Sequence, residues 1–225
     1  MANRYQRRII HLISEIITEI KFMIIDIFSR SIKAKRYDSV NKLKLNLGCG
    51  KNLKAGFINI DIKRNADLRL DLRNSLPFKD NTVDYIYSSQ FFEHIDYYDR
   101  TAINCLYDYL RILKKGGTLR MVVPDLEKFF NAYVDKDKDF FLMFSRIFKN
   151  IKNRIPKFGK YTSIDYINLI YYQSGFGFHK YNYDFEKIHN ILQNVGFRNI
   201  KKVDFNPEID PMKHRSVSLY IHAEK

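Results

Sequence analysis

The sequence predicts an α/β fold with a mostly parallel, doubly wound sheet of seven strands, an N-terminal amphipathic helix and a helical insertion. Short apolar runs alternate with helical or turn segments between residues 43 and 130, and glycines directly follow the first run. Of the 225 residues, 45% are hydrophobic and 28% are charged, as expected for one soluble domain with additions. This composition argues against a disordered chain and against a bundle of membrane helices. Two cysteines are too few for a disulfide framework or a cysteine-rich zinc site.

The N-terminal segment is predicted to form an amphipathic helix. Its isoleucines recur at spacings of three and four residues, at Ile9, Ile13, Ile16, Ile20, Ile24 and Ile27. Charged residues such as Glu15 and Lys21 interrupt the apolar run, which excludes a secretory signal and a membrane span. We expect residues 1–42 to form a helical extension whose isoleucine stripe packs on the domain or on a second copy of it. The alternative is peripheral membrane contact through residues 9–28, because basic residues flank the stripe at both ends.

The segment from residue 43 to residue 62 carries the most information. Alternating leucines at 43–47 lead into Gly48-Cys49-Gly50, which predicts a strand ending in a tight glycine turn. A second apolar run, 57–60, ends at Asp61. Glycines let a backbone approach a ligand closely, and a carboxylate at the end of the neighbouring strand can accept hydrogen bonds from a ribose. We therefore expect a cofactor to bind beyond the carboxyl ends of these strands.

Two common nucleotide-binding patterns do not fit this segment. The dinucleotide pattern needs a third glycine where Leu53 stands, and Asp61 follows Gly50 too soon for a full crossover helix, which disfavours a nicotinamide enzyme. A phosphate loop of the Walker type needs Gly-Lys-Ser/Thr, but Lys51 is followed by Asn52.

The remaining elements follow in order along the chain. Three further strands are predicted from short apolar runs, at 67–72, 83–88 and 119–123. Leu106, Leu110 and Leu113 predict a helix before the last of these strands, and residues 114–117 predict its stop. A terminal strand pair is expected from Phe205 onward, which completes the seven strands.

Five segments now carry a resemblance to a known family: LNLGCG at 45–50, INID at 58–61, SLPFKDNTVDYIYSSQFFEHI at 75–95, RILKKGGTLRMVVPDL at 111–126 and HKYNYDFEKIHNILQNVGF at 179–197. In this order and spacing the chain resembles the class I S-adenosylmethionine-dependent methyltransferases, especially the small bacterial type 11 group often linked to surface-sugar biosynthesis. The resemblance implies a Rossmann-like fold and S-adenosylmethionine as cofactor. The link between the first two strands is shorter than in the broader class, which leaves little room for a long first helix.

The resemblance also assigns residues to the cofactor. It places the glycine turn against the methionine part, Asp61 at the ribose hydroxyls, and the adenine near residues 71–72. The residues that close the fourth strand would line the sulfonium. The resulting cofactor set is Gly48, Cys49, Gly50, Asp61, Ile62, Asp71, Leu72, Ser88, Ser89 and Gln90. Asp71 has a structural alternative as a turn residue, and Cys49 is expected to act as a small packing residue rather than a nucleophile.

Methyl transfer to a hydroxyl needs a group that removes the hydroxyl proton. The candidates are His179, Asp125 just beyond the fifth strand, and His94 after the fourth strand. Each has a structural alternative, and for Asp125 it is a helix N-cap. No His, Cys or Asp cluster stands at metal-ligand spacing, so no metal site is expected. The Ser88–Phe91 segment lacks the Pro-Pro-aromatic motif of amino-methylating nucleic-acid enzymes, and neither cysteine follows a proline as in cytosine C5 enzymes.

The net charge of +14 is concentrated in two segments. Residues 1–42 carry +5 and residues 136–160 carry +6, while residues 43–135 carry only +2. The second segment belongs to an insertion at about 134–177, which we expect over the acceptor site. Its basic side chains could attract a phosphate, a nucleotide-sugar or an anionic glycan, or could form a solvated face: Lys149, Lys152, Arg154, Lys157 and Lys160.

We therefore expect two parts, an extension at 1–42 and a methyltransferase domain at 43–225. The predicted function is S-adenosylmethionine-dependent methylation of a hydroxyl on a small molecule or glycan. An RNA methyltransferase remains an alternative, as does a non-catalytic S-adenosylmethionine-binding module at a membrane; without a recognised RNA-binding module, nucleic acid is the less favoured partner. The expected location is the cytoplasm, with peripheral membrane contact as the variant.

Overall fold

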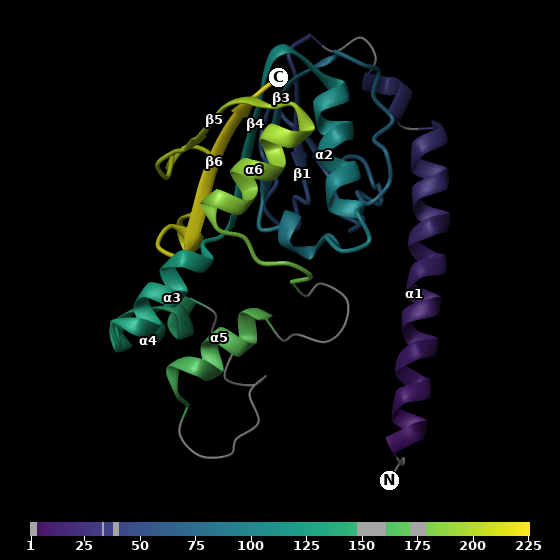
Figure 1. The fold of residues 1–225 in the computed structure, drawn as a ribbon. Helices are drawn as coiled ribbons and strands as arrows, with labels where there is room; N and C mark the ends of the chain where they lie inside the picture. Colours follow the sequence, from purple (N-terminus) through teal and green to yellow (C-terminus); the bar gives the residue numbers. More distant parts are fainter. Residues whose placement is uncertain (1–3, 33, 38–40, 148–160, 172–178) are drawn as a thin grey trace.

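A computed structural model describes residues 4–32, 34–37, 41–147, 161–171 and 179–225. Its centre is one six-stranded sheet in the order β2-β1-β3-β4-β6-β5 (Figure 1). The strands are β1 (Leu43–Leu47), β2 (Ile58–Ile60), β3 (Val83–Ser89), β4 (Leu113–Pro124), β5 (Arg198–Lys202) and β6 (Ser218–Glu224). The first four strands run parallel, and β6 lies antiparallel between β4 and β5. The sheet confirms the expected mostly parallel, Rossmann-like α/β fold.

The prediction of a seventh strand, at residues 67–72, is wrong for the described part of the chain. Residues 67–72 form only a single bridge, between Leu68 and Ile60. Carboxylates divert the backbone from a ladder, because Asp67 accepts a hydrogen bond from the Asn59 amide at 2.9 Å. Asp71 accepts another from the amide of Arg73, at 3.0 Å, which closes a turn.

Two boundaries also differ from those expected. The terminal pair begins with β5, ahead of Phe205. Residues 114–117 belong to β4 rather than to a helix stop. The pairing of β3 with β4 shifts register across this stretch, and Gly116 has a positive φ of 76°. A glycine in this conformation suits an irregularity inside a strand.

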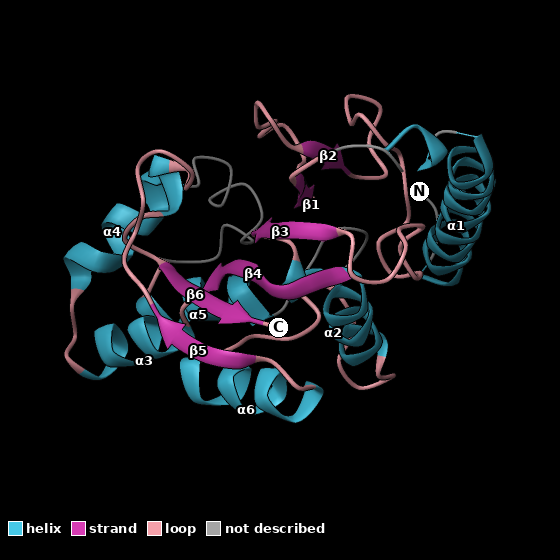
Figure 2. Cartoon of the chain, turned by 90° about the horizontal axis from the view of Figure 1, so that it is seen from above, coloured by secondary structure: helices cyan, strands magenta, loops and turns pink. Residues whose placement is uncertain are grey.

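Alternation along the strands explains the two faces of the sheet. Ile86 of β3 shares a core with Leu106 of α2 (Thr101–Ile112) and Leu192 of α6 (Phe185–Val195). Tyr87, the next residue, joins a second cluster with Phe205 and Ile209. Figure 2 shows α2 and α6 together on one side of the sheet. The segment after β5 that supplies Phe205 and Ile209 to this face holds no helix between residues 203 and 211. The links 48–57 and 61–82 also hold no helix, in keeping with the short first link.

Three helices follow β4 at the edge of the sheet where this strand ends (Figure 1). They are α3 (Leu126–Val134), α4 (Lys138–Ile147) and α5 (Ser163–Tyr171). They share a small apolar core formed mainly by Phe129, Phe141, Phe144, Ile167 and Ile170. The predicted basic side chains at 149–160 lie outside the described residues.

The helix α1 (Arg4–Ile32) runs along one side of the domain (Figure 1). Its apolar stripe does not pack on the domain as expected, because Ile13, Ile16 and Ile20 are 49–59% exposed. No helix within the described parts of the chain combines the length and apolar character needed to cross a membrane. Short 3-10 turns complete the fold at Ala34–Tyr37, Phe92–His94 and Met212–His214.

Candidate active site

The glycine turn is fixed at the carboxyl end of β1. The amides of Gly48 and Cys49 both donate to the Ile60 carbonyl, at 2.9 and 3.2 Å. Gly48 has a φ of +67°, and a Cβ on it would lie 2.2 Å from Cγ of Phe91. Only glycine fits here, because the Phe91 ring lies directly on the turn. Phe91 was not predicted from sequence, since nothing local links it to residue 48.

Asp61 follows β2 and faces the same turn. One carboxylate oxygen accepts from the Gly50 amide at 2.8 Å and the other from the Lys63 amide at 3.0 Å. The side chain is 9% exposed. Each oxygen keeps further acceptor capacity, which is what a ribose diol requires. The neighbouring Ile62 accepts from the Arg69 guanidinium through its carbonyl, at 3.2 Å.

Cys49 lies inside this turn as a packing residue. It is 3% exposed. Burial, together with the negative charges of Asp61 and Asp67, raises the pKa of its thiol to about 12. The thiol is therefore protonated at neutral pH and is a poor nucleophile.

The end of β3 lies beside the glycine turn. Ser88 pairs with Leu47 in the parallel ladder, and its buried hydroxyl has no hydrogen-bond partner among the described residues. Ser89 closes the strand, and Gln90 follows with a φ of +52°. The Gln90 amide donates to Val122, and its side chain donates to the hydroxyl of Ser218 at 3.1 Å. A buried polar atom without a partner marks this edge as a place for a ligand.

Asp71 and Leu72 occupy a different environment. Burial raises the pKa of Asp71, but hydrogen bonds from Arg73 outweigh this, so the pKa lies below its usual value. Its amide donates to a carboxylate oxygen of Asp26 on α1, at 2.9 Å. Leu72 is buried, and its carbonyl faces the Cys105 thiol at 3.2 Å. These contacts give Asp71 the structural role of a turn residue.

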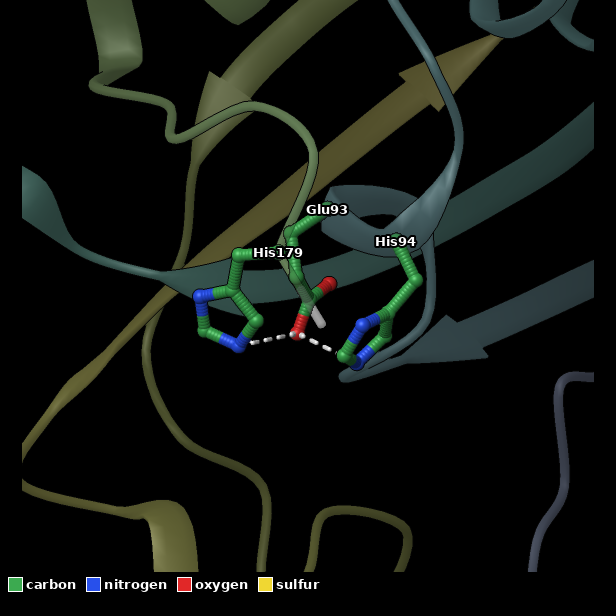
Figure 3. Close-up of side chains that lie close together, drawn as sticks. All are labelled: Glu93, His94 and His179. Carbon is green, nitrogen blue, oxygen red and sulfur yellow. Dashed lines mark ion pairs between the residues drawn. The ribbon is translucent and has the colours of Figure 1, made fainter. Parts of the chain in front are cut away.

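His94 and His179 converge on a residue that was not predicted, Glu93 (Figure 3). The Nε2 atoms of His94 and His179 lie 3.9 and 4.0 Å from the same oxygen of Glu93. The amides of Lys180 and Tyr181 donate to the Glu93 carbonyl at 2.7 and 3.2 Å, which fixes the two segments together. The only sequence signal for Glu93 was its place beside His94.

The electrostatics of this cluster are unusual. Glu93 is fully buried, and burial raises its pKa to about 8. Burial and the neighbouring His94 lower the pKa of His179 to about 4, so its imidazole is neutral at pH 7. Strongly shifted groups that share one place in a structure are candidates for function.

Asp125 has different partners. Its carboxylate is fully buried, and the Nζ atoms of Lys128 and Lys202 each lie 3.6 Å from it. It stands at the N-cap position of α3, but its side chain makes no cap hydrogen bond. Its backbone bridges to Tyr183, which connects it to the segment that follows His179.

Comparison with known families decides what this edge of the sheet belongs to. Residues 45–121, which include the glycine turn, Asp61 and the Glu93–His94 pair, match the family model described as a methyltransferase domain. The match assigns a methyltransferase domain to this part of the chain. No curated protein sequence matches the chain.

Several solved structures are similar to this chain. One is a SAM-dependent methyltransferase from Archaeoglobus fulgidus, with 16% identity, 91% of this chain and 94% of that chain covered, and a TM-score of 0.47. A second is a SAM-dependent methyltransferase from Aquifex aeolicus, with 12% identity, coverage of 86% and 88%, and a TM-score of 0.42. A third is phosphoethanolamine N-methyltransferase 2 from Haemonchus contortus in complex with S-adenosyl-L-methionine, with 14% identity, coverage of 87% and 52%, and a TM-score of 0.46.

The fold therefore brings together most of the residues expected from the sequence. The glycine turn, Asp61 and the end of β3 lie at one edge of the sheet. His94 and His179 converge on Glu93. Glu93 comes two residues after Phe91, whose ring packs on the glycine turn. S-adenosylmethionine, the cofactor expected from the sequence, would supply from its sulfonium a methyl group for an electron-rich acceptor atom.

Proposed function

We propose that the chain methylates a hydroxyl group of a small molecule or glycan. The observation that carries the proposal is the Glu93–His94–His179 cluster at the edge of the sheet that holds the glycine turn. A hydroxyl is a weak nucleophile until it loses its proton, and polar groups partly screened from water are suited to promote that loss. An amine acceptor would need no such group once it is uncharged.

The cofactor fits the residues around the glycine turn. Asp61 would accept hydrogen bonds from the ribose hydroxyls, because both of its oxygens have acceptor capacity beyond their backbone bonds. The unpartnered hydroxyl of Ser88 would face the methionine part, near the methyl group. Phe91 would shield that side of the turn from water.

Aromatic side chains beside the cluster favour a glycan acceptor. The rings of Tyr97 and Tyr181 lie 4.4 Å apart, and Tyr98 packs edge-on to Tyr181 at 5.8 Å while remaining 81% exposed. Tyrosine offers an apolar face and a hydroxyl on one rigid ring, which suits the mixed surface of a sugar. Tyr181 is two residues from His179, so this surface adjoins the reacting group.

The test replaces two of the expected catalytic residues together, His179→Ala with Asp125→Asn. We expect S-adenosylhomocysteine formation with hydroxyl-bearing glycans to fall about 100- to 10,000-fold, while S-adenosylmethionine binding persists by calorimetry. His189→Ala, on α6, is the matched histidine control. Unchanged turnover would contradict the catalytic role of these two residues. Methylation of RNA, with a steeply salt-dependent affinity, would instead identify RNA as the acceptor in place of a glycan hydroxyl.

A second proposal concerns α1, which we infer lies on an anionic membrane surface. Its polar side faces the domain: Asp26 accepts from the Asp71 amide, and the Glu19 carboxylate accepts from Arg73 at 2.6 Å. Its apolar side faces outward, with Ile9, Ile24 and their neighbours more than half exposed. The exposed Arg8 near the start of the helix would meet anionic headgroups.

A further inference from the structure

Glu93 and His179, beside His94, face each other with lone pairs that form no hydrogen bond within the described residues. Nδ1 of His179 lies 3.2 Å from the side-chain oxygen of Asn182, which can only accept a hydrogen bond. Nδ1 therefore carries the proton, and Nε2 presents a lone pair. That lone pair faces a carboxylate oxygen of Glu93 at 4.0 Å. A proton on Glu93 could not bridge this gap, because 4.0 Å is too long for a hydrogen bond, whereas a bound metal cation could contact both atoms.

The spacing of the three side chains is that of metal ligands rather than of hydrogen bonds. His94 Nε2 lies 3.9 Å from the same oxygen, and one ligand atom from each residue falls within 4.8 Å of the others. These separations are too long for hydrogen bonds. In a tetrahedral zinc site, ligand atoms about 2.1 Å from the ion lie roughly 3.4 Å from one another. The distance from each histidine Nε2 to the Glu93 oxygen therefore needs to shorten by only about half an ångström to match that geometry.

Glu93 gives independent support for a ligand. It is fully buried, and neither carboxylate oxygen has a hydrogen-bond partner within the described residues. A buried carboxylate without a partner is costly, and a bound cation removes that cost. The histidine side chains are 26% and 18% exposed, which leaves a path from solvent to the site.

The surroundings also resemble those of a built metal site. A ligating histidine commonly donates its other ring N–H to an oxygen acceptor, which fixes the ring and the tautomer. Asn182 has this position toward His179. The two backbone hydrogen bonds onto the Glu93 carbonyl hold residues 93 and 179 together across a long stretch of chain.

We propose that Glu93, His94 and His179 bind one zinc ion and leave its fourth position open. Two imidazoles and one carboxylate with an open position are a donor set of catalytic zinc, whereas magnesium and calcium prefer oxygen ligands. Sequence patterns do not predict this site, because its ligands come from segments 85 residues apart and match no known metal-binding motif.

The role of the ion rests on the proposed function. An acceptor hydroxyl bound at the open position loses its proton to solvent near neutral pH, as zinc-bound water does. The resulting oxygen attacks the methyl carbon, so a C–O bond forms while the C–S bond breaks. The electron pair of that bond stays on sulfur, and S-adenosylhomocysteine leaves.

The experiment is a zinc titration of the full chain after chelator treatment and dialysis. We expect calorimetry and metal analysis to give one zinc per chain, with a rise in Tm on binding. His179→Ala and Glu93→Gln should weaken binding about a hundredfold and abolish the Tm rise. His189→Ala should bind as the wild-type chain does.

Glu93→Gln separates loss of the site from loss of the fold. It keeps the shape and is neutral, as the buried carboxyl with its raised pKa mostly is in the metal-free chain at pH 7, so its metal-free Tm should stay near that of the wild-type chain. Absence of stoichiometric zinc binding, or binding by both variants as tight as that of the wild-type chain, would overturn the proposal. Zinc binding without methylation of any hydroxyl would leave the site standing and refute the proposed function instead.

Discussion

Gly48 and Phe91 pack closely at the carboxyl end of β1, where we propose that the cofactor binds. Replacing Gly48 with Ala would place a Cβ against the Phe91 ring and force an alanine into a left-handed conformation. We expect unfolding in urea to show a loss of about 2–5 kcal/mol, together with weaker S-adenosylmethionine binding.

Gly56→Ala is the matched control for that substitution. Its φ is +74°, but a Cβ there meets nothing within 4 Å. It should lower the free energy of unfolding by only about 1–2 kcal/mol, because alanine is strained in this left-handed backbone conformation, and it should leave the cofactor affinity unchanged. Equal losses in the two variants would show that the Phe91 contact is unimportant.

Local patterns predict one half of the site and not the other. Gly48, Gly50 and Asp61 are within 14 residues of each other, so the strand and turn pattern is enough to place them together. Glu93 and His179 meet only because the amides of residues 180 and 181 bond to the Glu93 carbonyl. No single-sequence pattern specifies such a long-range contact, so the sequence analysis did not bring these side chains together.

At the scale of elements, patterns predict the existence of a helix or strand better than its partners. The isoleucine period predicts an amphipathic helix at the N-terminus, but it does not say which side faces the domain. Buried Asp26 accepts from the Asp71 amide and from Arg30 at 3.0 Å, so the polar side docks and the apolar side faces outward. The strand expected at 67–72 fails because its carboxylates bond to local amides.

The outward apolar side of α1 leads to a test with vesicles. The full chain should sediment with vesicles of phosphatidylglycerol and phosphatidylcholine, and less so at high salt. Ile16→Glu with Ile20→Glu should abolish sedimentation, because it places two charges on the apolar side.

The control for the vesicle test changes exposed apolar residues elsewhere. Val134→Glu with Met212→Glu alters side chains that are 75% and 64% exposed, away from α1. This variant should sediment like the wild-type chain. A dimer in solution without vesicle binding would instead assign the apolar side of α1 to a second copy.

At the scale of the whole molecule, charge is separated from the predicted chemistry. Residues 43–135 carry the glycine turn, Asp61 and Glu93, yet their net charge is only +2. The surplus lies in the extension and in the insertion after β4, so the overall charge of +14 says little about the reaction. Composition therefore predicts only a globular domain, while the α/β class and the reaction had to be inferred from ordered motifs.

The stability of the whole fold should fall with acid through His214, on the segment that covers the second face of the sheet. Burial, with a smaller effect of Lys213, lowers the pKa of His214 from 6.5 to about 4. Between pH 6.5 and pH 4 the imidazole of His214 binds a proton in the unfolded chain but not in the folded chain. The contribution of neutral His214 to the stability of the fold is therefore complete above pH 6.5 and is lost as the pH falls toward 4. The slope from one such group is at most about 1.4 kcal/mol per pH unit. His214→Gln should flatten the pH dependence of urea unfolding over this range by up to that slope. A variant as acid-sensitive as the wild-type chain would show that the imidazole is already charged in the folded state.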